Sequence, residues 1–144
     1  MKQLQVGIAT FQVLIEGNYV YADKTRSIYE MVTGPDKFFF LSRPRRFGKS
    51  LLLSTLKSLF SGPPDPDGPP QGLFQNLWIG RRSDYDFSQT YPVLNLFMSF
   101  SSLTPEAFLA TLASRMNFIA NKEKLHLNFT SSTVDLSLLI ESLA

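Results

Sequence analysis

The sequence predicts an α/β fold of three αβα layers, in which helices cover both faces of a parallel β-sheet. The first observation is the apolar run Phe38–Leu41, which suits a strand buried on both faces. The second is a basic turn ending in Gly48, Lys49 and Ser50, with leucines at helical spacing directly after it. The third is composition, because 144 residues with 44% hydrophobic content suffice for one core and one domain.

Before the apolar run, the residues predict a strand and a helix. A turn at Glu16–Asn18 leads into Tyr19–Tyr21, an expected edge strand. A helix should follow, with Asp23 or Thr25 as its cap and Thr33–Pro35 as its end. Its inner face would carry Ile28, Met31 and Val32.

After the basic turn, the pattern predicts a helix, a loop and a second core strand. The helix would pack on the sheet through Leu52, Leu56 and Leu59, with Leu53 and Phe60 beside them. Residues 61–72 hold five prolines and three glycines, which favours a surface loop over a proline-rich ligand for a partner domain. Residues 73–79 should cover an edge of the core, and Pro92–Leu96 reads as the next strand.

Two further helices are expected in the last third of the chain. Thr104 and Pro105 form a helix start, with threonine at the cap and proline at the first helical position, and the helix should reach Asn121. Ser132, with Asp135 three positions later, would cap the last helix.

The turn before Leu51 has the residues of a nucleotide-binding P-loop. Gly48 has no Cβ to block a phosphate, Lys49 can reach the terminal phosphates, and the hydroxyl of Ser50 can ligate Mg²⁺. The full pattern is G-x-x-x-x-G-K-[ST], and Arg43 stands where its first glycine should be. The match is therefore incomplete, and the backbone must leave the strand by another path, with the fixed φ of Pro44 as a possible help.

Positive charge gathers around the loop. By composition alone this cluster would favour a solvated basic turn or a contact with nucleic-acid backbone, but its position between an apolar run and a helix start favours a phosphate ligand. Four cationic residues lie within seven positions and suit a triphosphate with about four negative charges. The alternative is a basic turn that binds nucleic acid or another polyanion, for which a net charge of +2 is too weak an argument by itself. The predicted nucleotide-binding residues are Arg43, Pro44, Arg45, Arg46, Phe47, Gly48, Lys49, Ser50 and Leu51, with Ser50 as the metal ligand.

Three segments carry a resemblance to a known family. Residues Ser42–Leu53, which read SRPRRFGKSLLL, resemble the P-loop of the AAA-ATPase-like family of bacterial proteins, where RPRRFGKS replaces the glycine-led loop. Residues Phe11–Glu30 are similar to that family's upstream segment with its Y-x-D-K-T core. Residues Tyr91–Leu96 resemble its second strand, although Phe97 stands where the family usually has aspartate. The similarity spans nearly the whole chain.

The resemblance implies binding of ATP with Mg²⁺, and ATP hydrolysis, by a P-loop fold of the additional-strand type. Longer members often carry a PD-(D/E)XK nuclease-like domain, through which nucleic acid could be a partner, and these 144 residues hold no such domain. The segment before the first core strand often lies near the adenine in such ATPases. Tyr19, Tyr21 and Asp23 are candidates there, although packing and capping explain them more simply.

Hydrolysis also needs an acid, normally at the end of an apolar strand, to hold magnesium and polarise the attacking water. Leu138–Glu141 has that form, but its cap and helical spacing favour an amphipathic helix. In the resembling family this Walker B strand follows such a helix, which would place it after Ala144. We therefore expect residues 1–144 to be the N-terminal part of the P-loop domain, with no catalytic residue identified and enzyme activity left open. A degenerate, inactive fragment is the remaining alternative.

The cysteine content and the absence of long apolar runs exclude several kinds of site and location. Cysteine is absent, which excludes disulfides, thiolate metal sites and cysteine nucleophiles. The sequence shows no signal peptide and no membrane span, so we expect a cytoplasmic protein.

Overall fold

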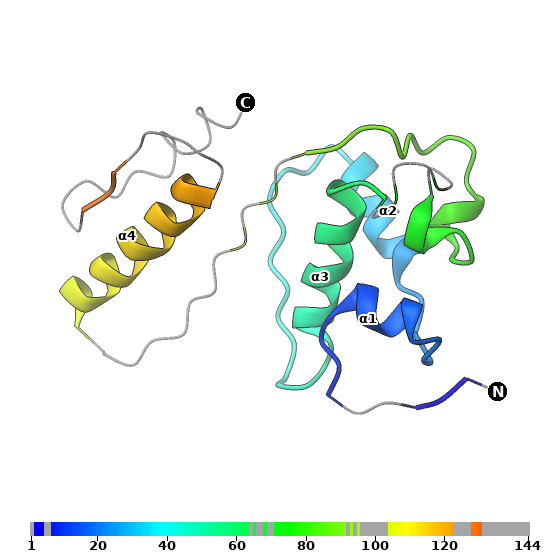
Figure 1. The fold of residues 1–144 in the computed structure, drawn as a ribbon, viewed down its shortest axis with the longest axis horizontal. Coiled ribbons are helices and arrows are strands. Elements are labelled where there is room, and N and C mark those ends of the chain that lie inside the picture. The colour runs from blue at the N-terminus through cyan, green and yellow to red at the C-terminus, as the bar shows by residue number, and fades with distance from the viewer. Residues whose placement is uncertain are drawn as a thin grey trace. The chain divides into compact units, whose positions relative to one another are not determined.

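The computed structural model describes residues 2–4, 7–63, 65, 68, 71–91, 93, 95, 104–122 and 128–130. The chain divides into two compact units, Met1–Val93 and Leu94–Ala144. Along the chain the described elements are α1 (Phe11–Glu16), α2 (Thr25–Thr33), α3 (Lys49–Phe60), the 3₁₀ turns η1 (Gly72–Phe74) and η2 (Ile79–Arg81), and α4 (Pro105–Lys122) (Figure 1).

The described residues form helices and no β-sheet, so the predicted αβα fold with a parallel sheet is wrong. Phe38–Leu41, the expected first core strand, lies in no helix or strand, and the side chains of Phe38 and Phe40 are 94% and 93% exposed. The expected edge strand at Tyr19 is reduced to a single parallel β-bridge with Gln3. A strand forms only when a neighbour satisfies its N–H and C=O groups, and an apolar run alone does not specify that neighbour.

Two predicted elements lie outside the described residues. Of the expected strand Pro92–Leu96, the structure describes only Val93 and Asn95, and neither is in a strand. The helix expected from Ser132 onward, with its Leu138–Glu141 run, is not described either.

Helices α2 and α3 form in the segments where the sequence predicts them, but two details differ. The N-cap of α2 is Lys24, with no side-chain cap, rather than Asp23 or Thr25, and α3 packs on other helices because the described residues form no sheet. Helix α2 ends at Thr33 with Gly34 as its C-cap, and Ile28 on its inner face is fully buried. On α3, Leu59 is buried, and Leu52 and Leu56 pack against the same core. Leu53, which was expected beside them, is instead 50% exposed.

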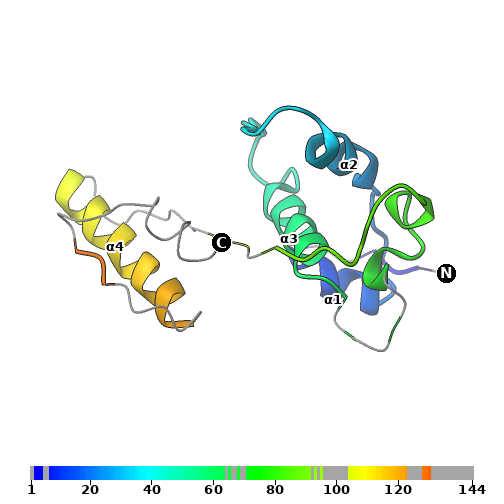
Figure 2. The same ribbon diagram turned by 90° about the horizontal axis from the view of Figure 1, so that it is seen from above.

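Aromatic and aliphatic side chains from α1, α2, α3, the two 3₁₀ turns and the segment after η2 form one core in the first unit. Phe11 is fully buried, and its ring stacks on Phe74 at 4.8 Å and meets Tyr21 edge-on at 5.2 Å. Helix α1 lies beside α3 in both views (Figure 2). The buried members are Phe11, Ile28, Leu59, Phe74, Ile79 and Phe87.

The carboxylate of Asp23 joins the start of α2 to the turn before η2. Its Oδ1 accepts hydrogen bonds from the N–H of Thr25 at 2.8 Å and from the Thr25 hydroxyl at 2.6 Å. Its Oδ2 accepts one from the N–H of Trp78 at 2.8 Å, and the Thr25 hydroxyl accepts one from the N–H of Ile79. Partial burial raises the pKa of Asp23, but these hydrogen bonds outweigh it and leave the pKa below its ordinary value.

In the second unit the structure describes Asn95, Thr104, helix α4 and the short segment 128–130. The helix starts as predicted, because the Thr104 hydroxyl accepts a hydrogen bond from the N–H of Ala107. Buried residues of α4, among them Leu112, Met116 and Ala120, pack with the ring of Phe129.

Candidate functional site

The predicted P-loop lies directly before α3, which begins at Lys49. Gly48, the residue before the helix, has φ 74° and ψ 17°, in the left-handed region that favours glycine. Arg46 also lies in this region, with φ 67°. The P-loop pattern has its first glycine at the position of Arg43. In the structure, the loop residues with left-handed backbone are instead Arg46 and Gly48. A non-glycine residue with this backbone is strained, and such strain concentrates at functional sites.

The lysine of the loop is held by the loop itself. Lys49 Nζ donates a hydrogen bond to the backbone carbonyl of Arg43, with a distance of 2.6 Å between the two atoms. This contact joins the two ends of the turn. Both of its residues are exposed to solvent. The side chain of Lys49 is therefore placed over the loop, in reach of any anion that the turn encloses.

The start of α3 offers backbone donors. Its first intrahelical hydrogen bond runs from the N–H of Leu52 to the carbonyl of Gly48 at 2.8 Å, and no side chain caps the helix. The N–H groups of the three residues before Leu52 have no acceptor within the helix. These donors and the helix dipole together favour a bound anion.

A cavity of about 700 Å³ lies at this helix start. Five predicted site residues line it, while Arg43, Pro44, Arg45 and Phe47 do not. The remaining lining comes from Gly7, Ile8 and Ala9, which the sequence prediction missed because the segment carries no charge and no motif. The predicted residues in the lining are Arg46, Gly48, Lys49, Ser50 and Leu51.

Tyr21 and Asp23, considered as neighbours of a nucleotide base, make structural contacts instead. The Tyr21 hydroxyl lies 3.4 Å from the hydroxyl of the buried Thr55, and burial raises the pKa of Tyr21. Asp23 is bound to Thr25 and Trp78, as described above. Packing accounts for Tyr21, and hydrogen bonds to Thr25 and Trp78 account for Asp23.

The chemistry of the loop fits phosphate and magnesium. Ser50 lines the cavity in the first turn of α3, and its hydroxyl is an oxygen ligand of the kind that Mg²⁺ accepts together with water and substrate phosphates. Among the residues that the structure describes, no group of three or more His, Cys, Asp or Glu side chains could hold a metal ion.

A second charged cluster lies at the surface between α2 and the segment after η2. The Arg82 guanidinium sits over the rings of Tyr29 and Trp78, 5.2 Å and 5.3 Å from their centroids. Asp84 accepts hydrogen bonds from Arg82 Nε at 2.8 Å and from the Tyr29 hydroxyl at 2.7 Å. The hydrogen bonds from Arg82, followed by that from Tyr29, lower the pKa of Asp84 to about 2. These polar groups bind one another, so we assign the cluster to structure.

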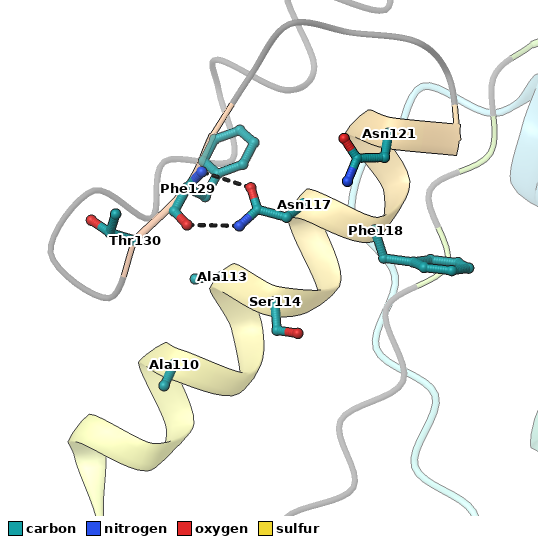
Figure 3. A pocket seen from close by; sticks show the side chains of 8 residues that line it. All are labelled: Ala110, Ala113, Ser114, Asn117, Phe118, Asn121, Phe129 and Thr130. Carbon is teal, nitrogen blue, oxygen red and sulfur yellow. Dashed lines mark hydrogen bonds between the residues drawn. The ribbon is translucent and has the colours of Figure 1, made fainter.

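An open depression of about 540 Å³ lies on α4 in the second unit. Figure 3 shows Asn117 pointing from the helix to the backbone of Phe129, whose carbonyl accepts from Nδ2 at 2.8 Å and whose N–H donates to Oδ1 at 2.7 Å. The lining has no charged side chain, which makes it a poor place for phosphate or metal chemistry. It consists of Ala110, Ala113, Ser114, Asn117, Phe118, Asn121, Phe129 and Thr130.

The helices in the described part of the chain include none long and apolar enough to cross a membrane.

Comparison with known proteins gives one family and one relative. The model of a family described as "Predicted AAA-ATPase" matches residues 5–143. A protein of Azotobacter chroococcum mcd 1, called "Uncharacterized protein in vnfD 5'region", is 42% identical over 96 residues, which are 66% of this chain and 17% of that protein. The chain thus aligns with a small part of this relative's length. No solved structure matches the chain.

Proposed function

We propose, since this chain belongs to the predicted AAA-ATPase family, that its loop Arg43–Leu51 binds the phosphates of Mg-ATP. The observation that carries the proposal is the cavity at the start of α3. Gly48, Lys49 and Ser50 line it together, and the first turn of the helix has backbone N–H groups without intrahelical acceptors.

Each residue has a chemical role in this proposal. Gly48 turns the chain so that the N–H groups after it face one volume, and it keeps that volume clear because it has no Cβ. Lys49 exchanges the Arg43 carbonyl for the terminal phosphates. Ser50 ligates Mg²⁺ through its hydroxyl, and the guanidinium of Arg46, which also lines the cavity, adds positive charge.

ATP hydrolysis is a separate step and needs an acid that orients and polarises water. The described residues give no candidate beside the loop, so the activity that we propose for this chain is binding. Such a protein would act in the cytoplasm, where ATP is abundant.

The test is to measure the Kd for Mg-ATP of wild type and two lysine variants. Lys49→Ala should weaken binding at least roughly 100-fold, because it removes charge-assisted hydrogen bonds worth about 3 kcal/mol. The matched control is Lys57→Ala, which removes the same charge from the last turn of the same helix and should leave the Kd unchanged. Equal Kd values for the two variants would contradict the proposal.

The alternative, a polyanion-binding module, has one observation in its favour. Arg43, Arg45 and Arg46 are all exposed, and the first two lie outside the cavity lining. Under this alternative, affinity for single-stranded DNA would fall steeply with salt, and a nucleotide would compete poorly. Under our proposal, excess Mg-ATP displaces a fluorescent ATP analogue from the loop, while DNA of equal charge does not.

A further inference from the structure

The segment between α2 and the loop, cyan in Figure 1, exposes a run of large apolar side chains. Phe38 and Phe40 are 94% and 93% exposed, whereas Phe39 and Leu41 are 50% and 40% exposed. Such alternation is typical of a strand, in which successive side chains point to opposite faces. Among the described residues, none exchanges a backbone hydrogen bond with residues 36–42. The segment therefore has the side-chain pattern of a strand, and its backbone N–H and C=O groups are open to a partner strand.

The ends of this segment are arranged symmetrically about its centre. Pro35 precedes it and Pro44 follows it, and proline ends a ladder because it has no N–H to donate. Just inside the prolines lie Asp36 at one end and Arg43 at the other, both exposed. Neither side chain takes part in an ion pair within the described part of the chain. A segment with opposite charges at its two ends complements a second copy of itself that runs in the opposite direction.

We propose that two copies of this chain pair through residues 36–43 as antiparallel strands, related by a twofold axis at the centre of the segment. In this register Asp36 of each copy lies opposite Arg43 of the other, so the ion pair occurs twice. At the centre, Phe39 of each copy lies opposite Phe40 of the other. The contact removes apolar side chains from water and satisfies the open backbone groups.

Other ways of pairing the segment with itself are less favourable. A parallel, in-register pair would put each charged residue opposite its own copy, which is destabilising. A shift of the antiparallel register by one position would place Lys37 opposite either Leu41 or Arg43. The charges thus select one register. A single pair of short strands buries less than the roughly 1,200 Å² at which standard interfaces begin, so we expect a weak dimer.

The first experiment measures the mass of the full chain by sedimentation at increasing concentration. Wild type should pass from monomer to dimer between about 1 µM and 1 mM, the range of a weak contact. Asp36→Arg and Arg43→Asp should each weaken the dimer at least roughly tenfold, because like charges then face each other twice. A mixture of these two variants should regain the wild-type affinity, since their charges complement each other. Glu16→Arg, the same change of charge at another exposed position, is the control and should leave the dimer Kd unchanged.

The second experiment tests the direction of the strands by disulfide formation, because the chain has no cysteine of its own. Lys37→Cys and Ser42→Cys each introduce one thiol, at positions that lie opposite each other in the proposed register. A mixture of the two variants should form disulfide-linked dimers faster than either variant alone.

The results that would overturn this inference are distinct. A chain that stays monomeric up to about 1 mM, or a dimer that ignores both charge reversals, has no such contact. Faster linkage within each cysteine variant than between them would show parallel strands, and assemblies that grow beyond the dimer would show open stacking. Fluorescence of Trp78, the single tryptophan, checks that each variant is folded. None of these results bears on phosphate binding by the loop.

Discussion

Asp23→Asn should destabilise the first unit of the chain through the loss of one long-range contact. The asparagine keeps an oxygen that can accept from Thr25, but an NH₂ group would replace the oxygen that accepts from the N–H of Trp78. A hydrogen bond to a charged group contributes about 1.5–3 kcal/mol, and because Asp23 is partly exposed we expect a loss of about 2 kcal/mol. For a unit of this size the Tm should fall by about 10 °C.

The assay is urea unfolding followed by the fluorescence of Trp78, which lies at the contact itself. Asp86→Asn is the matched control, because Asp86 binds the N–H and the hydroxyl of Ser88 in the same local arrangement. It should change the free energy of unfolding by less than about 0.5 kcal/mol. Equal losses for the two variants would show that the contact between Asp23 and Trp78 adds no stability, and would refute the reasoning.

Three further predictions concern the loop, the second unit and pH. Gly48→Ala should lower the free energy of urea unfolding by about 1 kcal/mol, because alanine disfavours a φ of 74°, and it should also weaken Mg-ATP binding. An unchanged free energy of unfolding and an unchanged Kd would contradict this prediction. Asn117→Ala should speed amide exchange at Phe129 roughly tenfold, since both hydrogen bonds to that backbone are lost, whereas an unchanged rate would show that they do not protect it. The pKa of Asp84 is about 2 in the folded chain against an ordinary 3.8, so its contribution to the free energy of unfolding is present above pH 3.8 and is lost as the pH falls towards 2. Asp84→Asn should therefore make the urea midpoint depend less on pH between 3.8 and 2. A midpoint that falls as steeply in the variant as in wild type would argue against the contact with Arg82.

The sequence could predict elements whose signals are local. Helix α3 follows from leucines at helical spacing after the loop, and α4 follows from Thr104 and Pro105 at its start. The same reasoning wrongly predicted a buried strand at Phe38–Leu41, because an apolar run does not specify which other residues would pack against it. The loop of the candidate site was recognisable because its chemistry is concentrated in consecutive residues.

The sequence could not reveal contacts between distant residues. Asp23 and Trp78 are 55 positions apart, and nothing in either segment points to the other. Phe11 and Ser54, whose backbone N–H and hydroxyl share a hydrogen bond, are 43 positions apart. The first pair follows from the packing of α2 against η2 and the second from the packing of α1 on α3, so only the folded chain brings them together.

The most direct test of nucleotide binding by the loop is an NMR titration of the chain with Mg-ATP, read at the backbone amides. The account predicts that the largest shifts fall on Gly48, Lys49 and Ser50, whose N–H groups would donate to the phosphates, and that Lys49→Ala removes them. Shifts that spread over exposed cationic residues elsewhere, or no shifts at saturating nucleotide, would contradict it.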